Sequence, residues 1–598
     1  MLVQKSHPHG VATLEHGSFL ASETVRVCAA RCTSSSGALI TRRSEVLPRW
    51  VEPGFVYGYD IEVRVGIQRF VHHRQREEIR HDLKEQHGIS LSTGEVSTLA
   101  ARFIQHLEAL HRQRAPAIRK ALARDGGYPL QIDATGEDGR GTLFIAYAGW
   151  RGWVLGSWKI STERADLILP HLREVAASFG APCAVLRDLG KAVIPAALDF
   201  VKELRRKIPI ISCHLHFLSD VGEDLLEPSH DELRDLFRRY EIRPRLRTLA
   251  RDLGRRIGSK LSSLRDDVST WAEEATEHRL PEGPAGLATV RSLAQWGLDY
   301  ASDGDHLGFP FDRPYLDLYE RCRTVRRAAD AFLRRLIKDR AVRRALRRLV
   351  RILDPVFADP SVSGVAKTLS CRAKLFDELR DALRLCPKSS SQQEPDQSTV
   401  PPEKASAELR DIRKALNALT RSLRRRRPER GPAQDSRRAI DLILDHLDRH
   451  GDSLWGHVIQ LPARVGGGIR VVARTNNQVE GFFHQMKHGE RRRSGRKVLS
   501  QDFEVLPAGA ALAYNLNHPD YVKLLCGSLE KLPEAFAALD RSRRTHDRKR
   551  SSSDSLESET FSASFPQADR RIVRADSLRR IIEDAARSRA PRLKLASG

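Results

Sequence analysis

The spacing of apolar residues changes along the chain, and each change predicts a different kind of element. From Arg74 to about Leu122, apolar residues recur every three or four positions, which is the period of an amphipathic helix. Between residues 128 and 213, short apolar segments are separated by glycine-containing turns and by helical stretches. Helical periodicity then dominates residues 226–470. The pattern predicts an α/β protein whose mixed-sheet core is interrupted by a large all-α insertion.

The helical segment before the sheet is predicted to hold two helices joined by a short turn. Ile79 and Leu83 share one face of the first helix, which ends at Gly88. Ser92 followed by Glu95 is the pattern of a capping box that starts the second helix. Such a pair is typical of a helix-turn-helix, but helical hairpins without DNA share the pattern. On the helix-turn-helix interpretation, the side chains expected to point outward toward DNA are Thr93, Glu95, Ser97 and Arg102.

The next segment is predicted to form a sheet with helices between its later strands. Strands are expected at residues 128–134, 141–148, 153–160, 183–186 and 208–213, and helices at residues 163–178 and 193–204. Three successive strands followed by alternating helix and strand is the element order of an RNase H-like core.

Two carboxylates fall at strand ends of this predicted sheet. Asp133 is near the end of the first strand, and Asp188 immediately follows the fourth. Adjacent strands lie about 4.8 Å apart, so both side chains can share a pair of divalent cations, the arrangement that two-metal phosphoryl transfer requires. The alternative is that Asp133 caps a turn and Asp188 caps a helix.

A third carboxylate lies on a helix predicted much later in the chain. Residues 475–477 supply N-caps, and Glu480 stands beside an apolar stripe formed by Val479, Phe482, Phe483 and Met486. A helix docked on the sheet through that stripe would project Glu480 toward the metals. Basic residues follow, and they are either solvated or placed to hold phosphates near the site. The candidates for phosphate contact are Lys487, Arg491, Arg492, Arg493, Arg496 and Lys497.

These segments resemble bacterial DDE transposases of the branch with a large helical insertion, which is related to the mutator-like and hAT groups. The match runs through QIDATGED at 131–138, VLRDLGKA at 185–192 and TNNQVEGFFHQMKHGERRRSGR at 475–496, and it extends over residues 60–530. The family also carries a Cys-x-x-His motif between the second Asp and the Glu, as Cys213 and His216 do here. The resemblance implies recognition of transposon ends, metal-dependent strand cleavage and strand transfer.

Four residues outside the carboxylate set are chemically notable. Cys213 and His216 are either buried residues that position the core after the fifth strand, or participants in metal or DNA engagement. Cys28 and Cys32 have no second ligand pair at a finger-like spacing, which favours two buried thiols over a zinc site. For the three carboxylates, oxygen ligands favour Mg²⁺ or Mn²⁺.

The patterns predict six regions. They are an irregular or β region at 1–56, a helix-turn-helix region at 57–125, the first part of the core at 126–225, the helical insertion at 226–470, the second part of the core with the Glu480 helix at 471–530, and a basic flexible tail at 541–598. Within the insertion, helices are expected at 231–240, 246–274, 315–353, 374–385 and 407–427, with a Pro/Ser/Gln-rich disordered linker at 386–408; one tail helix is expected at 577–587.

Composition narrows the partner and the compartment. The 598 residues include 101 Lys and Arg against 77 Asp and Glu, a formal net charge of +24. Such an excess favours nucleic acid over a membrane surface as the partner, although a coding bias would explain the preference for Arg over Lys. Eight scattered cysteines and the lack of any long apolar stretch predict a cytoplasmic protein, and the resemblance implies a bacterial protein that associates with the nucleoid.

The predicted function is therefore that of a DNA transposase, an enzyme acting on transposon ends and target DNA as a homo-oligomer assembled on DNA. The alternative is a catalytically inactive or domesticated DNA-binding protein that keeps the fold. A plain metal-dependent nuclease is the nearest enzyme, and it differs because it does not join the cleaved 3′-hydroxyl to target DNA.

Overall fold

A computed structural model describes residues 2–33, 37, 39–44, 46–137, 140–258, 264, 280–281, 283–304, 307–385 and 401–553. The chain divides into two units, Met1–Leu539 and Asp540–Gly598. The sheet, its covering helices and the helical lobe described below all belong to the first unit.

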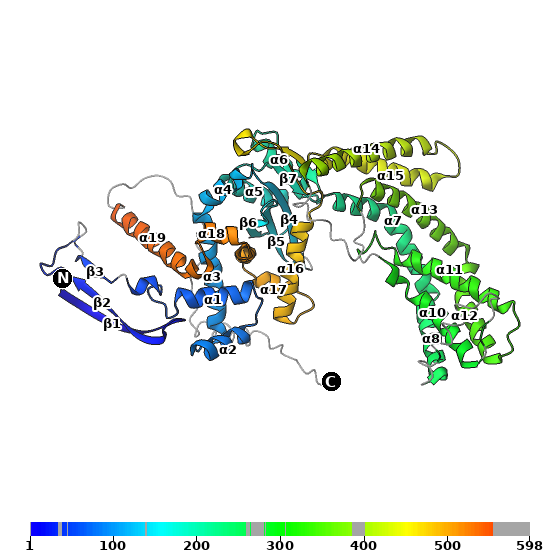
Figure 1. The fold of residues 1–598 in the computed structure, drawn as a ribbon, viewed down its shortest axis with the longest axis horizontal. Coiled ribbons are helices and arrows are strands. Elements are labelled where there is room, and N and C mark those ends of the chain that lie inside the picture. Colours follow the sequence, from blue (N-terminus) through cyan, green and yellow to red (C-terminus); the bar gives the residue numbers. More distant parts are fainter. Residues whose placement is uncertain are drawn as a thin grey trace, which may run out of the picture. The chain divides into compact units, whose positions relative to one another are not determined.

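A five-stranded mixed sheet lies at the centre of the first unit's main core (Figure 1). Its strand order is β6-β5-β4-β7-β8. The strand β5 is antiparallel to both of its neighbours, β4 and β6, whereas β7 pairs in parallel with β4, and β8 pairs in parallel with β7. All five predicted strands are confirmed, as β4 (Pro129–Glu137), β5 (Arg140–Ala148), β6 (Trp153–Lys159), β7 (Ala184–Arg187) and β8 (Ile210–Ser212).

The two predicted helices between the later strands are also present. The helix α5 (Ala165–Phe179) carries the chain from β6 at one edge of the sheet to β7, which pairs with β4. The helix α6 (Val193–Glu203) is the crossover that joins the parallel neighbours β7 and β8. The apolar run of β5 is buried along its length, which is typical of a strand covered on both faces. Other elements that contact the sheet come from the end of the chain: α16 (Asn477–Ser494) and α17 (Ser500–Val505) contact β4, and the 3₁₀ segment η6 (Ala508–Asn517) contacts β6.

The N-terminal part begins with a three-stranded antiparallel sheet and continues with four helices. The strands are β1 (Leu2–Thr13), β2 (Gly17–Val27) and β3 (Thr41–Arg43), followed by the short η1 (Leu47–Arg49). The helices are α1 (Tyr59–Phe70), α2 (Arg76–His87), α3 (Thr93–Gln113) and α4 (Ala115–Arg124). Their buried side chains belong to the same hydrophobic cluster as the sheet.

The turn between α2 and α3 has the predicted chemistry. Gly88 ends α2 with a left-handed φ of 65°, a conformation that glycine adopts without a steric penalty. The hydroxyl of Ser92 accepts from the backbone N–H of Glu95 at 3.2 Å, and the Glu95 carboxylate accepts from the Ser92 N–H at 2.6 Å. The capping box is therefore confirmed.

A helical lobe with its own hydrophobic cluster follows β8. Its helices are α7 (His214–Arg239), α8 (Ile242–Ile257), α10 (Gly283–Leu298), α11 (Pro314–Leu333), α12 (Arg340–Ala358), α13 (Pro360–Ala382), α14 (Pro402–Arg426) and α15 (Gln434–His450), with the short η3 (Tyr300–Asp303) before α11. The helices begin directly after the sheet rather than at residue 226, because α7 starts one residue after Cys213, its N-cap.

Three helix boundaries in and after the lobe differ from the prediction. The helix expected at 315–353 is broken into α11 and α12, and Asp339 caps the second of these through its carboxylate. Residues 402–408 were expected in a disordered linker but belong to α14, whose proline at the first helical position has no N–H that would need a partner. The tail was expected to be flexible from residue 541, but its first residues belong to α19 (Leu532–Ser553).

Other expectations fall wholly or partly outside the described residues. They concern the linker at 386–400, most of 259–279 and the tail helix at 577–587. None of the helices in the described ranges has the length and apolar character needed to cross a membrane.

The chain returns to the sheet through short elements. These are η4 (Gly451–Leu454), the antiparallel pair β9 (Val458–Gln460) and β10 (Ile469–Val471) with η5 (Ala463–Val465) between them, and then α16. Beyond α17 and η6, α18 (Pro519–Leu525) and η7 (Leu529–Lys531) lead to α19. The predicted apolar stripe of α16 is confirmed, because Val479, Phe482, Phe483 and Met486 are all buried in the main core.

Candidate metal centre

The fold brings Asp133, Asp188 and Glu480 together from three elements. The parallel register pairs Ile132 of β4 with Arg187 of β7, so the next residues, Asp133 and Asp188, follow side by side. Glu480 lies in the first turn of α16, which contacts β4. The charges of Asp188 and Glu480 both raise the pKa of Asp133, which places the three carboxylates within electrostatic reach of one another.

Asp133 lies inside β4 and not at its end, because the strand continues to Glu137. The side chain is 8% exposed, and burial is the largest cause that raises its pKa to about 7; the negative charge of Asp188 is the next. The backbone N–H of Ala134 donates to its Oδ1 at 2.8 Å. The interpretation of Asp133 as a turn cap is wrong. The residue is instead a buried carboxylate whose charge is costly without a nearby cation.

Asp188 does not cap a helix either. The next helix, α6, begins at Val193, and its N-cap is Ala192. The Asp188 carboxylate accepts from the backbone N–H of Gly190 at 3.1 Å, which holds it in the loop directly after β7. Two more acidic side chains, Glu163 and Asp220, interact electrostatically with Asp188. Burial is the main cause that raises the pKa of each, and the negative charge of Asp188 also raises it.

Asn476 positions Asp133, a role that the sequence did not suggest. The residue was expected to cap α16, and it occupies the N-cap position, but its side chain makes no capping bond. Its Nδ2 donates instead to Oδ2 of Asp133 at 3.0 Å, and its backbone N–H donates to Sγ of Cys213 at 3.3 Å. Asn476 is fully buried. A buried amide thus links the start of α16 to both β4 and the start of α7.

Glu480 faces a second set of metal-ligand atoms. Its Oε1 is buried without a hydrogen-bond partner among the described residues and lies 3.7 Å from Nε2 of His216. One ligand atom each from Cys213, His216 and Glu480 lies within 4.8 Å of the other two. Burial lowers the pKa of His216, but interaction with the Cys213 thiol and the charges of Glu480 and Asp133 outweigh it and raise that pKa to about 10.

The arrangement supports both interpretations of the Cys-x-x-His pair. Cys213 is buried and accepts from the Asn476 backbone, which fits a positioning role. His216 as a cation offsets part of the carboxylate charge, whereas a neutral His216 could join Cys213 and Glu480 around a metal. The sulfur and nitrogen donors suit zinc-like ions, while the three carboxylates offer the oxygen donors that Mg²⁺ and Mn²⁺ prefer.

The basic residues of α16 divide into structural and exposed ones. Lys487 was expected to meet phosphate, but its Nζ donates to the backbone oxygen of Gly136 at 3.1 Å. Arg491 pairs with Glu137 at 3.2 Å, so both side chains join α16 to the end of β4. Arg493 is 17% exposed and pairs with Glu490 and Asp502, which also removes it from the set that faces outward. The exposed members are Arg492 on α16 and, directly after the helix, Arg496 and Lys497; of these, Arg496 also pairs with Asp502 at 3.4 Å.

Fewer residues of α3 face outward than the four that were predicted to do so. Arg102 is 15% exposed, because it forms ion pairs with Glu52 and Glu62 and lies 3.6 Å from the centre of the Phe55 ring. Glu95 is occupied by the capping box and by the hydroxyl of Tyr57. The outward orientation predicted for both residues is therefore wrong. The exposed Ser97 donates to the backbone oxygen of Thr93, which is half-buried.

Cys28 and Cys32 are not the buried pair that was expected. Cys28 is half-buried and Cys32 is exposed, and the Cys28 thiol donates to Sγ of Cys32 at 3.2 Å. The hydrogen bond between the two thiols is the largest cause that lowers the pKa of Cys28, and it is also the largest cause that raises the pKa of Cys32. No group of three potential ligands in the described part of the chain includes either residue.

Comparison with known proteins gives no match, since no family model and no curated protein matches this chain.

Proposed function

We propose that the chain is a DNA transposase in which Asp133, Asp188 and Glu480 hold divalent cations for strand cleavage and strand transfer. The observation that carries the proposal is the convergence of the three carboxylates: burial first, and then the charges of Asp188 and Glu480, raise the pKa of Asp133 to about 7. The strand order β6-β5-β4-β7-β8, with its change from antiparallel to parallel at β4, supports an RNase H-like core.

The residues present fit a divalent cation. Glu480 has a buried carboxylate oxygen without a hydrogen-bond partner among the described residues, and Asp133 is buried beside two other carboxylates. Asp133, Asp188 and Glu480 would hold Mg²⁺ or Mn²⁺ through oxygen. When bound, a pair of such ions activates the attacking oxygen and stabilises the leaving one. The protein supplies the geometry: Asn476 and the Ala134 N–H each hold one oxygen of Asp133, and the Gly190 N–H holds Asp188.

The charge of the chain supports DNA as the substrate. The net charge of +24 provides a sequence-independent attraction to phosphates. The pair α2 and α3, joined by the Gly88 turn, supports a helix-turn-helix that reads the ends of a mobile element. The exposed basic residues at the end of α16 continue from the helix that carries Glu480.

A joining assay tests the proposed function. The purified chain is mixed with labelled DNA from either side of its gene, an unlabelled target duplex and Mg²⁺. We expect strand cleavage followed by covalent joining of the cleaved 3′-hydroxyl to the target, and we expect EDTA to abolish both. Cleavage without joining would indicate a nuclease instead, and salt-sensitive binding without cleavage would indicate an inactive DNA-binding protein.

Asn476→Ala is expected to weaken the use of Mg²⁺. Removing the donor that holds Asp133 should raise the Mg²⁺ concentration for half-maximal cleavage by about 10- to 100-fold, the usual cost of losing an outer partner of a metal ligand. Cleavage is measured over a Mg²⁺ titration, together with the thermal midpoint of unfolding. A loss of cleavage that saturating Mg²⁺ does not restore, matched by a loss of folded protein, would contradict the positioning role.

A further inference from the structure

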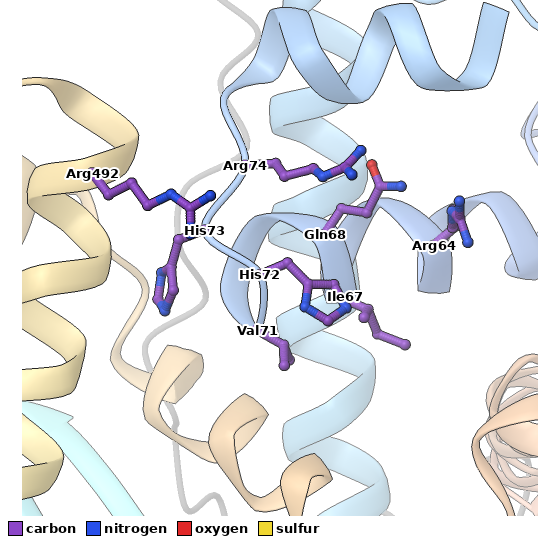
Figure 2. Close-up of a pocket in the computed structure, with 8 residues that line it drawn as sticks. All are labelled: Arg64, Ile67, Gln68, Val71, His72, His73, Arg74 and Arg492. Atoms are coloured by element: carbon purple, nitrogen blue, oxygen red, sulfur yellow. The ribbon is translucent and has the colours of Figure 1, made fainter. Parts of the chain in front are cut away.

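A basic pocket of about 600 Å³ lies away from the three carboxylates, between α1, the loop that follows it and the last turns of α16. Figure 2 shows Arg492 extending from α16 toward the loop that carries His73 and Arg74. Every ionisable side chain that lines the pocket is basic, and no carboxylate lines it. The lining residues are Arg64, Ile67, Gln68, Val71, His72, His73, Arg74 and Arg492.

The positive charge of this pocket is only partly balanced. Asp82 forms ion pairs with two of its arginines, at 3.1 Å from Arg64 and 3.6 Å from Arg74. The same carboxylate also accepts from Gln68 and Gln86, each at 2.6 Å. Arg492 is exposed and has no ion-pair partner in the described ranges. Among the described residues, Asp82 thus pairs with two of the pocket's three arginines, and the third, Arg492, keeps its charge unpaired.

His73 forms part of the pocket wall. Burial is the main cause that lowers its pKa; the charge of Glu490 opposes it, and the charges of Arg69, Arg492 and His72 lower the pKa further. Nε2 of His73 lies 3.1 Å from the hydroxyl of Tyr514, while its Nδ1 is buried without a hydrogen-bond partner among the described residues. The ring lies against α16 at Gly489, where an added Cβ would approach it to 2.3 Å. The wall of the pocket is thus held in place by packing.

We infer that this pocket binds a backbone phosphate of a nucleic-acid strand. Planar guanidinium groups from two sides of the pocket match the oxygens of a phosphodiester, and Ile67 and Val71 offer an apolar surface to its sugar. The inference rests on the proposed function in taking nucleic acid as the ligand. It adds the loop after α1, which carries none of the expected DNA contacts, to the DNA-binding surface.

The position of Arg492 sets the distance to the bound phosphate. Arg492 follows Glu480 by 12 residues on α16, so the two are separated by about 18 Å along the helix axis. Duplex DNA rises about 3.4 Å per base pair along each strand. A duplex lying parallel to α16 would therefore place the phosphate in the pocket about five base pairs from the bond at the carboxylates.

Salt-dependent binding of the full chain to a duplex, in EDTA, tests the pocket. Arg492→Ala and Arg74→Ala are each expected to lower the slope of log affinity against log salt by about 0.9, the contribution of one phosphate. The matched control is Arg410→Ala, an exposed arginine on α14, which should leave the slope unchanged. Both pocket residues are exposed, so these variants should keep the fold. An unchanged slope in Arg492→Ala would overturn the inference.

A second measurement locates the phosphate. One phosphate of the duplex at a time is replaced by a neutral methylphosphonate, and the affinity of each protein is measured. At one position, called the coupled position, the replacement should weaken binding by the native chain and by Arg410→Ala but not by Arg492→Ala. A free-ligand source is tested with inorganic phosphate and a mononucleotide: binding of either that depends on Arg492, with no coupled position on DNA, would overturn the assignment to nucleic acid. If the joining assay fails but a coupled position is found, the proposed transposase function is contradicted, while the assignment of the pocket to a nucleic-acid phosphate stands.

Discussion

Asp188→Asn is expected to reduce Mg²⁺-dependent strand cleavage by more than about 100-fold. Even the outer partners of metal ligands cost about 10- to 100-fold when they are removed, and Asp188 is proposed to touch the metal itself. The change keeps the oxygen that accepts from Gly190, so the loop after β7 should be undisturbed. Cleavage rates are measured at saturating Mg²⁺, and DNA affinity is measured separately in EDTA, where no loss is expected.

The control removes the same charge elsewhere in the core. Asp199 is an exposed carboxylate on α6, the helix that follows Asp188, and Asp199→Asn should cleave at the native rate. Native cleavage by Asp188→Asn would remove that residue from the metal site. A loss in both variants would show that the effect comes from the charge of this region and not from a metal ligand.

The metal-free protein is expected to lose stability as the pH rises from about 4 to about 7. The pKa of Asp133 is raised from 3.8 to about 7, so between these values the folded state binds a proton that the unfolded state has released. The stabilisation is complete below pH 3.8 and is lost as the pH rises through 7. Three pKa units correspond to about 4 kcal/mol at most.

The comparison that isolates this effect uses Asp133→Asn, which cannot titrate. Thermal midpoints of unfolding are measured in EDTA at several pH values for both proteins, because groups elsewhere contribute equally to each. The native chain should fall relative to the variant as the pH rises, and Mg²⁺ should restore the native chain alone, because it binds the ionised carboxylates. If the thermal midpoints of the two proteins change in parallel with pH in EDTA, the pKa of Asp133 is not raised in the folded protein.

The secondary structure of the sheet was predictable because its signals are local. Apolar runs bounded by Gly149 and Gly152, or by Gly180, mark where strands and helices end. The adjacency of Asp133 and Asp188 was expected because the element order is that of an RNase H-like core; the order alone leaves open whether β7 pairs with β4 or with β6, and the parallel pairing of β7 with β4 decides it. The Ser92 capping box was predictable for the same reason, because its two residues lie within one turn.

Contacts between residues far apart in the chain were not predictable. Asn476 has a local use as a helix cap, but Asp133, 343 residues earlier, takes its side chain instead. Arg102 and Arg493 look like free surface charges until the fold places carboxylates beside them. The helix α1 was missed because Ile61, Val63 and Val65 alternate with polar residues as in a strand; packing against α3 decides its conformation.

The two ends of the helical lobe meet at one place. The Ser212 and Ser453 hydroxyls lie 2.7 Å apart, and Nε2 of His214 lies 2.8 Å from the backbone oxygen of Leu454, although about 240 residues separate the members of each pair. These contacts join the residues that enter the lobe to the residues that leave it. Because doubling the length of an excursion costs only about 0.6 kcal/mol of closure entropy, the lobe can gain or lose helices over evolutionary time without moving Asp188 or Glu480.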